Sequence, residues 1–179
     1  MKTKLLAMAL FSLTLSSAGT LALAEMSTAS AGPSDAQIAA IAVAANDVDI
    51  DSARLAISKT KNSEVKNLAE GMLKDHMASN KSAKALCKKL GVKPEPNDSS
   101  KDLLKGGTSN IAKLKKLNGK AFDSAYAGHE VDFHQAVLDA IDHTLLPSAK
   151  NAELKSLVEQ IRAVVFAHLG HAKAVQASL

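Results

Sequence analysis

Cysteine is nearly absent from this sequence, since Cys87 is the single cysteine among 179 residues. One thiol excludes an internal disulfide. Cys87 follows Leu86 and precedes Leu90, a setting that predicts a small buried hydrophobe rather than a reactive thiol. No cysteine follows the N-terminal apolar segment directly, so a lipid-anchored lipoprotein is not indicated.

Aromatic residues are also scarce, at 3 % of the chain, and tryptophan is absent. The lysines cluster only modestly and have acidic residues among them, which is typical of solvated helix faces rather than of a nucleic-acid surface. The sequence contains no nucleophile–base motif, phosphate loop or cofactor fingerprint. Any enzymatic activity would therefore have to come from a bound metal.

The first 24 residues have the features of a secretory signal peptide. Lys2 and Lys4 precede a segment rich in Leu, Ala, Met and Phe, and residues 22–24 form an Ala-Leu-Ala cleavage signal. An uncleaved anchor is the alternative, but Ser and Thr interrupt the segment and no basic flank follows it. We expect cleavage after residue 24, a periplasmic or secreted location, and no transmembrane span in the mature protein. Cleavage removes two lysines and no acidic residue, so the formal net charge falls from +4 to +2.

Residues 25–33 are rich in Ser, Ala, Gly and Pro and predict a disordered leader, and residues 34–179 form one helical domain. Apolar residues recur there at steps of three and four, the pattern of amphipathic helices. Ser34 and Gln37 have the spacing of a capping box, Gly91 supplies a C-terminal stop, and Pro147 ends a helix. The predicted helices are about 34–59, 63–90, 99–117, 120–145 and 151–177.

Four of these helices are long, and their connections predict how they pack. The links at 60–63 and 146–150 are short, so each joins two antiparallel helices. The connection at 91–119 contains the short extra helix and is long enough to cross the length of a bundle. The expected fold class is all-α, an antiparallel four-helix bundle whose two hairpins are joined by one long crossover. This is the ferritin-like order.

Five polar residues interrupt the apolar faces near the middle of the four long helices, within roughly 6 Å of one level along the bundle. Burying such groups costs several kcal/mol unless they are paired, hydrogen-bonded or bound to a metal. Imidazoles and carboxylates suit zinc, iron or copper, and a carboxylate or carbonyl usually accepts the second N–H of each histidine. The predicted metal ligands are Asp49, His76, Glu130, His134 and His168.

Other polar residues near these positions have different expected roles. Asp75 projects about 100° away from its neighbour and is expected at the surface or as a partner between helices. His171 is either a further ligand or a residue at the rim. His129 and His143 lie off the inward face and are expected to be exposed, and Tyr126 is expected in the core with a satisfied hydroxyl.

Short motifs in these helices resemble a known family. They are Asp75-His76 followed by Asn80, Phe122-Asp123 with Tyr126 and His134, and His168-Leu169 followed by Ala172. Over about residues 35–177 they are similar to the bacterial exported proteins known as domain of unknown function 4142, which are placed among ferritin-like bundles. The resemblance implies an envelope location and a ferritin-like bundle, and it implies no established activity.

Two positions depart from related patterns. The resembled family usually has a glutamate in the first helix where this chain has Asp49, which is one methylene shorter. The Glu-x-x-His pairs of di-iron ferritin-like proteins are absent, since Leu73 and Val131 stand three residues before His76 and His134. Ferroxidase chemistry is therefore not expected.

We expect an exported ferritin-like bundle that binds one metal ion, zinc, iron or copper, for metal handling or envelope stress protection. The alternative is a metal-free structural or interaction protein of the envelope, in which a buried polar network fixes the register of the helices. An enzyme is the third and weakest option.

Overall fold

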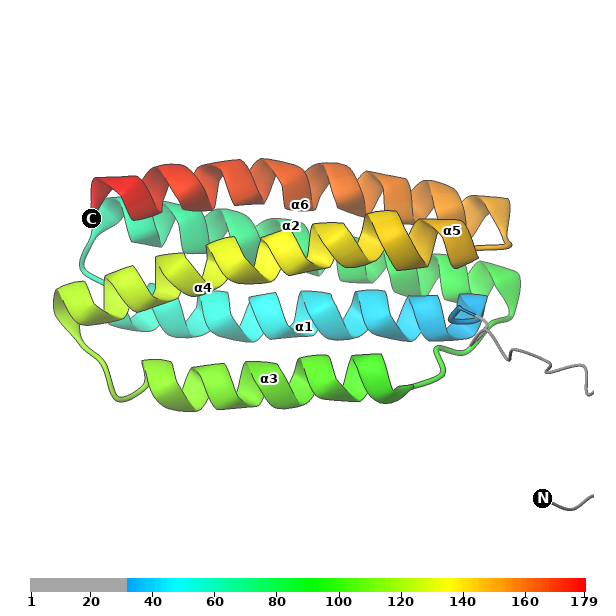
Figure 1. Cartoon of the computed structure of the whole chain (residues 1–179), viewed down its shortest axis with the longest axis horizontal. Helices are drawn as coiled ribbons and strands as arrows, with labels where there is room; N and C mark the ends of the chain where they lie inside the picture. Colours follow the sequence, from blue (N-terminus) through cyan, green and yellow to red (C-terminus); the bar gives the residue numbers. More distant parts are fainter. Residues whose placement is uncertain (1–31) are drawn as a thin grey trace, which may run out of the picture. The chain divides into compact units, whose positions relative to one another are not determined.

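The computed structural model describes residues 32–179, and these residues form an all-α structure without a strand (Figure 1). The predicted fold class is confirmed at this level. The predicted signal peptide, residues 1–24, and most of the predicted leader lie outside the described residues. The elements are α1 (Asp35–Lys59), α2 (Ser63–Leu90), α3 (Asp98–Leu114), α4 (Gly119–Ala140), η1 (Ile141–Leu145), α5 (Leu146–Ser148) and α6 (Ala152–Ser178).

The long helices α1, α2, α4 and α6 lie lengthwise beside one another, and α3 lies along α1 (Figure 1). α1 packs against α2 and α3, while α6 packs against α4 and α2. α1 and α2 run in opposite directions, as do α4 and α6. Because α3 returns along the length of α1, α2 and α4 begin at the same end and run in the same direction (Figure 1).

Local signals explain where the helices begin and end. Ser34 Oγ accepts from the backbone N–H of Gln37 at 3.2 Å, and the Gln37 side chain accepts from the Ser34 N–H at 3.0 Å. Asn62 caps α2, and Gly91 ends it in the left-handed conformation with φ of 65°. α3 begins at Asp98, slightly earlier than predicted, because Asn97 forms a capping box there.

Residues 120–145 are helical throughout, as predicted, but the hydrogen-bond pattern changes near the C-terminal end. α4 stops at Ala140, and residues 141–145 form a π-helix in which the N–H of Leu146 bonds to the carbonyl of Ile141. Pro147 has no N–H and cannot continue the regular α-helical ladder, and the chain turns to extended backbone at Ala149.

The apolar core is divided into two clusters, one toward each end of the long helices. One contains Ile38, Leu138, Ile141, Leu154 and Val158 among others. The other contains Ala53, Leu68, Met72, Phe122 and Tyr126 among others. The five predicted metal ligands are absent from both clusters. On α1, α2 and α4 they fall between the clusters in sequence, and on α6 His168 lies near the boundary between them. None of the helices within residues 32–179 has the length and apolar character needed to span a bilayer.

The packing of α3 on α1 depends on one glycine. A Cβ added at Gly107 would lie 2.7 Å from Cγ2 of Val48, whereas one added at Gly106 meets no atom of residues 32–179 within 4 Å. We expect Gly107→Ala to lower the free energy of unfolding by about 1–3 kcal/mol through overpacking. Its neighbour is the control, because Gly106→Ala should raise that free energy by about 0.5–1 kcal/mol. Urea unfolding of both variants measures the difference, and equal effects would contradict the close packing.

Candidate metal centre

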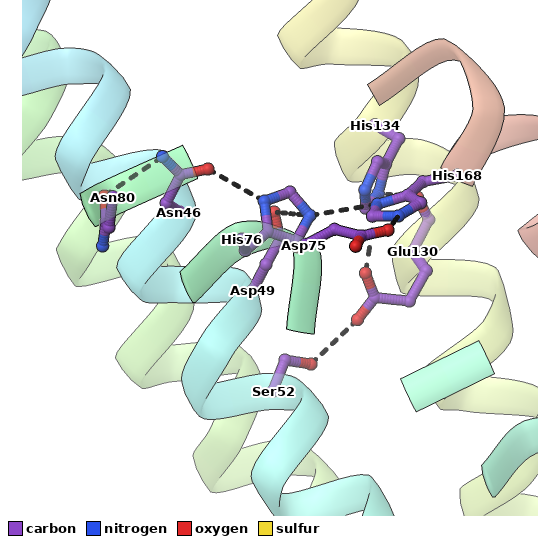
Figure 2. Close-up of polar contacts among 9 residues, drawn as sticks. All are labelled: Asn46, Asp49, Ser52, Asp75, His76, Asn80, Glu130, His134 and His168. Atoms are coloured by element: carbon purple, nitrogen blue, oxygen red, sulfur yellow. Dashed lines mark hydrogen bonds and ion pairs between the residues drawn. The ribbon is translucent and has the colours of Figure 1, made fainter. Parts of the chain in front are cut away.

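The structure brings the five predicted residues together between the two apolar clusters (Figure 2). α1 provides Asp49, α2 provides His76, α4 provides Glu130 and His134, and α6 provides His168. All five are buried, and His168 is the most accessible at 8 %. Their possible ligand atoms form two groups, the three histidines and Asp49–Glu130–His134, and within each group these atoms lie within 4.8 Å of one another. His134 belongs to both groups, so the two form one continuous cluster.

Each histidine has one ring nitrogen held by a partner other than the possible ligand atoms of the cluster. The contacts of His76 with Asn46 and of His168 with Asp75 are drawn in Figure 2. Nδ1 of His76 lies 2.8 Å from Oδ1 of Asn46. Nδ1 of His134 lies 2.8 Å from the carbonyl oxygen of Glu130, and Nε2 of His168 lies 3.1 Å from Oδ2 of Asp75. These contacts leave the second nitrogen of each ring available to the cluster, as in histidines that bind metals. Asp75 is thus a partner between helices, one of its two expected roles.

A chain of hydrogen bonds fixes which nitrogen of His76 carries the proton. The carboxylate of Asp47 only accepts, so the Nδ2 group of Asn80 donates to it, at 2.7 Å. Oδ1 of Asn80 then accepts from Nδ2 of Asn46 at 3.1 Å, which turns Oδ1 of Asn46 toward His76. That oxygen requires a proton on Nδ1 of His76. Nε2 of His76 therefore presents a lone pair to the cluster.

The inner nitrogens of the other two histidines also present lone pairs. The acceptors Asp75 and the Glu130 carbonyl place protons on Nε2 of His168 and Nδ1 of His134. Nδ1 of His168 then faces Nε2 of His76 at 3.2 Å. Two ligands of a tetrahedral ion with bonds of about 2.0 Å are separated by about 3.3 Å, so this spacing fits a shared metal. Two facing lone pairs require a positive centre, either a proton or a metal ion.

The two carboxyl groups lie against the histidines. Oδ2 of Asp49 is 3.3 Å from Nε2 of His76, and Oε2 of Glu130 is 3.6 Å from Nδ1 of His134. Ser52 donates to Oε1 of Glu130 at 2.9 Å. A proton on Asp49 can satisfy His76 when no ion is bound.

Several buried polar atoms of this region have no hydrogen-bond partner among residues 32–179: Oδ1 of Asp49, Oε2 of Glu130, Nε2 of His134 and the hydroxyl of Tyr126. The expectation of a satisfied Tyr126 hydroxyl was therefore wrong. Buried polar atoms normally have a partner, and leaving one unpaired costs about 1–3 kcal/mol. Three of the four are atoms of the kind that bind metals, so this donor set fits an ion.

Burial controls the charge of the cluster. Removal from water lowers the pKa of His76 to about 3 and that of His134 to about 4, and it also lowers the pKa of His168. The same desolvation raises the pKa of Glu130 to about 7 and raises that of Asp49, to which the nearby Glu130 charge adds. At neutral pH the imidazoles are thus neutral, the form that binds metals.

The remaining histidines have the following positions. His143 is exposed, as predicted, and His171 is exposed and thus a residue of the rim. The prediction for His129 was wrong, because its ring is half-buried and lies against Phe133, with ring centroids 5.6 Å apart. α3 packs mainly on α1 but also faces this side of α4, where Asn110 and Lys113 line a hollow together with His129. The docking of α3 therefore covers a face that periodicity alone assigns to solvent.

Sequence reasoning missed three polar residues that orient the cluster. Asn46 and Ser52 lie three residues to either side of Asp49, and Asn80 lies one turn after His76. All three are buried, with exposures of 5 % or less. The spacing of three and four from a predicted ligand was the available signal, because it places each residue on the same helix face.

Fold and site together define an all-helical protein with a buried cluster of three histidines and two carboxyl groups. The chain belongs to the family described as domain of unknown function (DUF4142), whose model matches residues 20–175. This confirms the resemblance seen in the sequence. Comparison with curated proteins and with solved structures gave no match.

Proposed function

We propose that this protein is an exported, ferritin-like four-helix bundle that binds one transition-metal ion in the buried cluster, for metal handling or envelope stress protection. The observation that carries the proposal is the convergence of three imidazole lone pairs, each oriented by a hydrogen bond at the other ring nitrogen. A metal-free network has no need for lone pairs that face one another.

The donor set favours zinc, copper or iron, because imidazole nitrogens suit all three. His76, His134 and His168 would bind through their inner nitrogens, and Asp49 and Glu130 would supply negative charge. Both carboxyl groups must lose their protons to do so, and metal uptake would then release protons. Ligands that are at least nine-tenths buried keep an ion from competing solvent ligands, which suits storage or sequestration.

The directions of the helices support the ferritin-like bundle. α1–α2 and α4–α6 are two antiparallel pairs, and α3 is the helix of the crossover between them (Figure 1). The basic start and the Ala-Leu-Ala signal at residues 22–24 support export to the periplasm or beyond.

Metal analysis tests the proposal directly. The exported chain is incubated with zinc, copper or iron, passed through a desalting column and analysed by mass spectrometry. We expect about one ion per chain, and less than a tenth of that in His134→Ala and His168→Ala, because each removes a ligand. His143→Ala removes an exposed histidine outside the cluster and is the matched control.

An unchanged metal content in His134→Ala would contradict the assignment of ligands. A wild-type chain that takes up none of the three metals would overturn the proposal. The cluster would then be a network that fixes helix register, and the protein the metal-free structural alternative.

A further inference from the structure

An apolar cavity of about 140 Å³ adjoins the histidine and carboxyl cluster, on the side of the apolar cluster that contains Ile38. Its walls come mainly from α1, α4, η1 and α6, with His76 added from α2 and Leu103 from α3. Most lining residues are aliphatic, including Val137, Ile141, Val158 and Val165. Asn46, Asp49, His76 and His134 also line it, so one end of the cavity lies at the cluster.

Small side chains form the boundary of the cavity between α1 and α4. Ala42 and Ala45 line it from α1, and Ala136 and Ala140 line it from α4. The two alanines of α4 are exposed and those of α1 are half-buried, so the cavity reaches the surface here. α1 contacts α4 at few points compared with its packing on α2, which leaves this opening between the two helices.

The volume and the walls limit what can occupy the cavity. An apolar cavity of about 150 Å³ stays dry and takes up a molecule of the size of benzene. A charged molecule would lose its hydration against aliphatic walls, at a cost of several kcal/mol. A compact, uncharged and mainly apolar molecule is therefore the class that fits.

The end of the cavity at the cluster offers an occupant almost no polar surface. Oδ1 of Asp49 and Nε2 of His134 have no partner among residues 32–179, but both atoms are buried, and almost all of the exposed cavity wall is apolar. An occupant therefore needs no hydrogen-bonding group.

We propose that this cavity binds a small, uncharged and apolar molecule of about the size of benzene, held among the aliphatic walls by burial of its apolar surface. This inference goes beyond metal binding, because the aliphatic walls are present with or without an ion.

Calorimetric titration of the exported, metal-free chain with phenol, benzene and benzoate tests the proposal. We expect saturable binding of benzene and phenol, with phenol no tighter than benzene because the cavity wall offers its hydroxyl no partner. Benzoate should bind at least tenfold more weakly than phenol, because its charge is not solvated among the walls.

Two variants fill the cavity, and a third adds the same bulk elsewhere. Ala45→Leu and Val137→Phe should each weaken phenol binding at least tenfold by occupying its volume. Ala174→Leu, on an exposed position of α6 far along the chain from the cavity lining, should bind phenol like the wild type. Circular dichroism verifies that each variant is folded. If Val137→Phe does not fold, the phenol binding of Ala45→Leu alone provides the test.

Absence of saturable binding of both phenol and benzene to the wild type would overturn the proposal. So would unchanged phenol binding in the folded cavity-filling variants. Parallel metal analysis separates this inference from the proposed function. A chain that binds phenol but no metal retains the cavity site and loses the metal site, and a chain that binds metal but no phenol does the reverse.

Discussion

Replacing His76 with leucine should stabilise the metal-free protein progressively as the pH falls, by about 3 kcal/mol between pH 7.5 and pH 4.5 relative to the wild type. Burial lowers the pKa of His76 to about 3 in the folded protein, from an ordinary value of 6.5. Below pH 6.5 the unfolded chain takes up a proton that the folded chain refuses, so the wild type loses stability as the pH falls toward 3. Leucine removes this loss.

The same substitution should have a different effect on metal binding. Leucine leaves Oδ1 of Asn46 without its histidine donor, which adds a cost that does not depend on pH, so the slope with pH is the diagnostic quantity. At pH 7.5 we expect the affinity for zinc to fall at least a hundredfold, because one of three nitrogen ligands is lost. Urea unfolding from pH 4.5 to 7.5 in the presence of a chelator measures the first effect, with His143→Leu as the control at an exposed position. A difference in stability that is constant across this range would contradict the buried, neutral imidazole.

Replacing Glu130 with glutamine should produce the opposite slope. Burial raises the pKa of Glu130 to about 7 from 4.5. Between these values the unfolded chain has released a proton that the folded chain retains, so the wild type loses stability as the pH rises from 4.5 through 7. Glutamine has no such proton, and it retains the oxygen that accepts from Ser52. We therefore expect Glu130→Gln to stabilise the metal-free protein by about 3 kcal/mol more at pH 8 than at pH 4.5.

Unfolding in urea at the two pH values, again with a chelator, measures this difference. Glu159→Gln changes an exposed glutamate on α6 and serves as the matched control. If Glu130→Gln has the same effect at pH 4.5 and pH 8, the carboxyl group is ionised throughout and the desolvation argument fails. Saturating zinc should reverse the ranking of the two proteins, because the wild-type carboxylate then has a cation beside it.

The helices could be predicted from the sequence because their signals are local. The capping residues Ser34 and Asn62, the left-handed Gly91 and the steps of three and four act within a few residues of the boundaries that they set. That the five cluster residues lie close together could also be predicted from local information. Each interrupts the apolar face of its helix near the midpoint, and helices of similar length that pack side by side bring their midpoints together.

The details that escaped prediction depend on contacts between helices. The half-burial of His129 requires α3 to face α4, and the proton on Nδ1 of His76 is set from Asp47 through two asparagines on two helices. The residue pattern within one helix predicts neither the burial of His129 nor the position of the proton on His76. The π-helix at residues 141–145 was missed because periodicity does not distinguish one widened turn from a regular one.

The cluster takes its members from α1, α2, α4 and α6, which span the chain from Asp49 to His168. No part of the chain shorter than this can assemble the cluster, so it is complete only when all four helices have docked. An ion bound there would crosslink the four helices only after folding is nearly complete. It would slow the unfolding rate and leave the folding rate almost unchanged. A chain with one cysteine, which can have no internal disulfide, would in this way gain a reversible crosslink whose lifetime depends on the supply of metal.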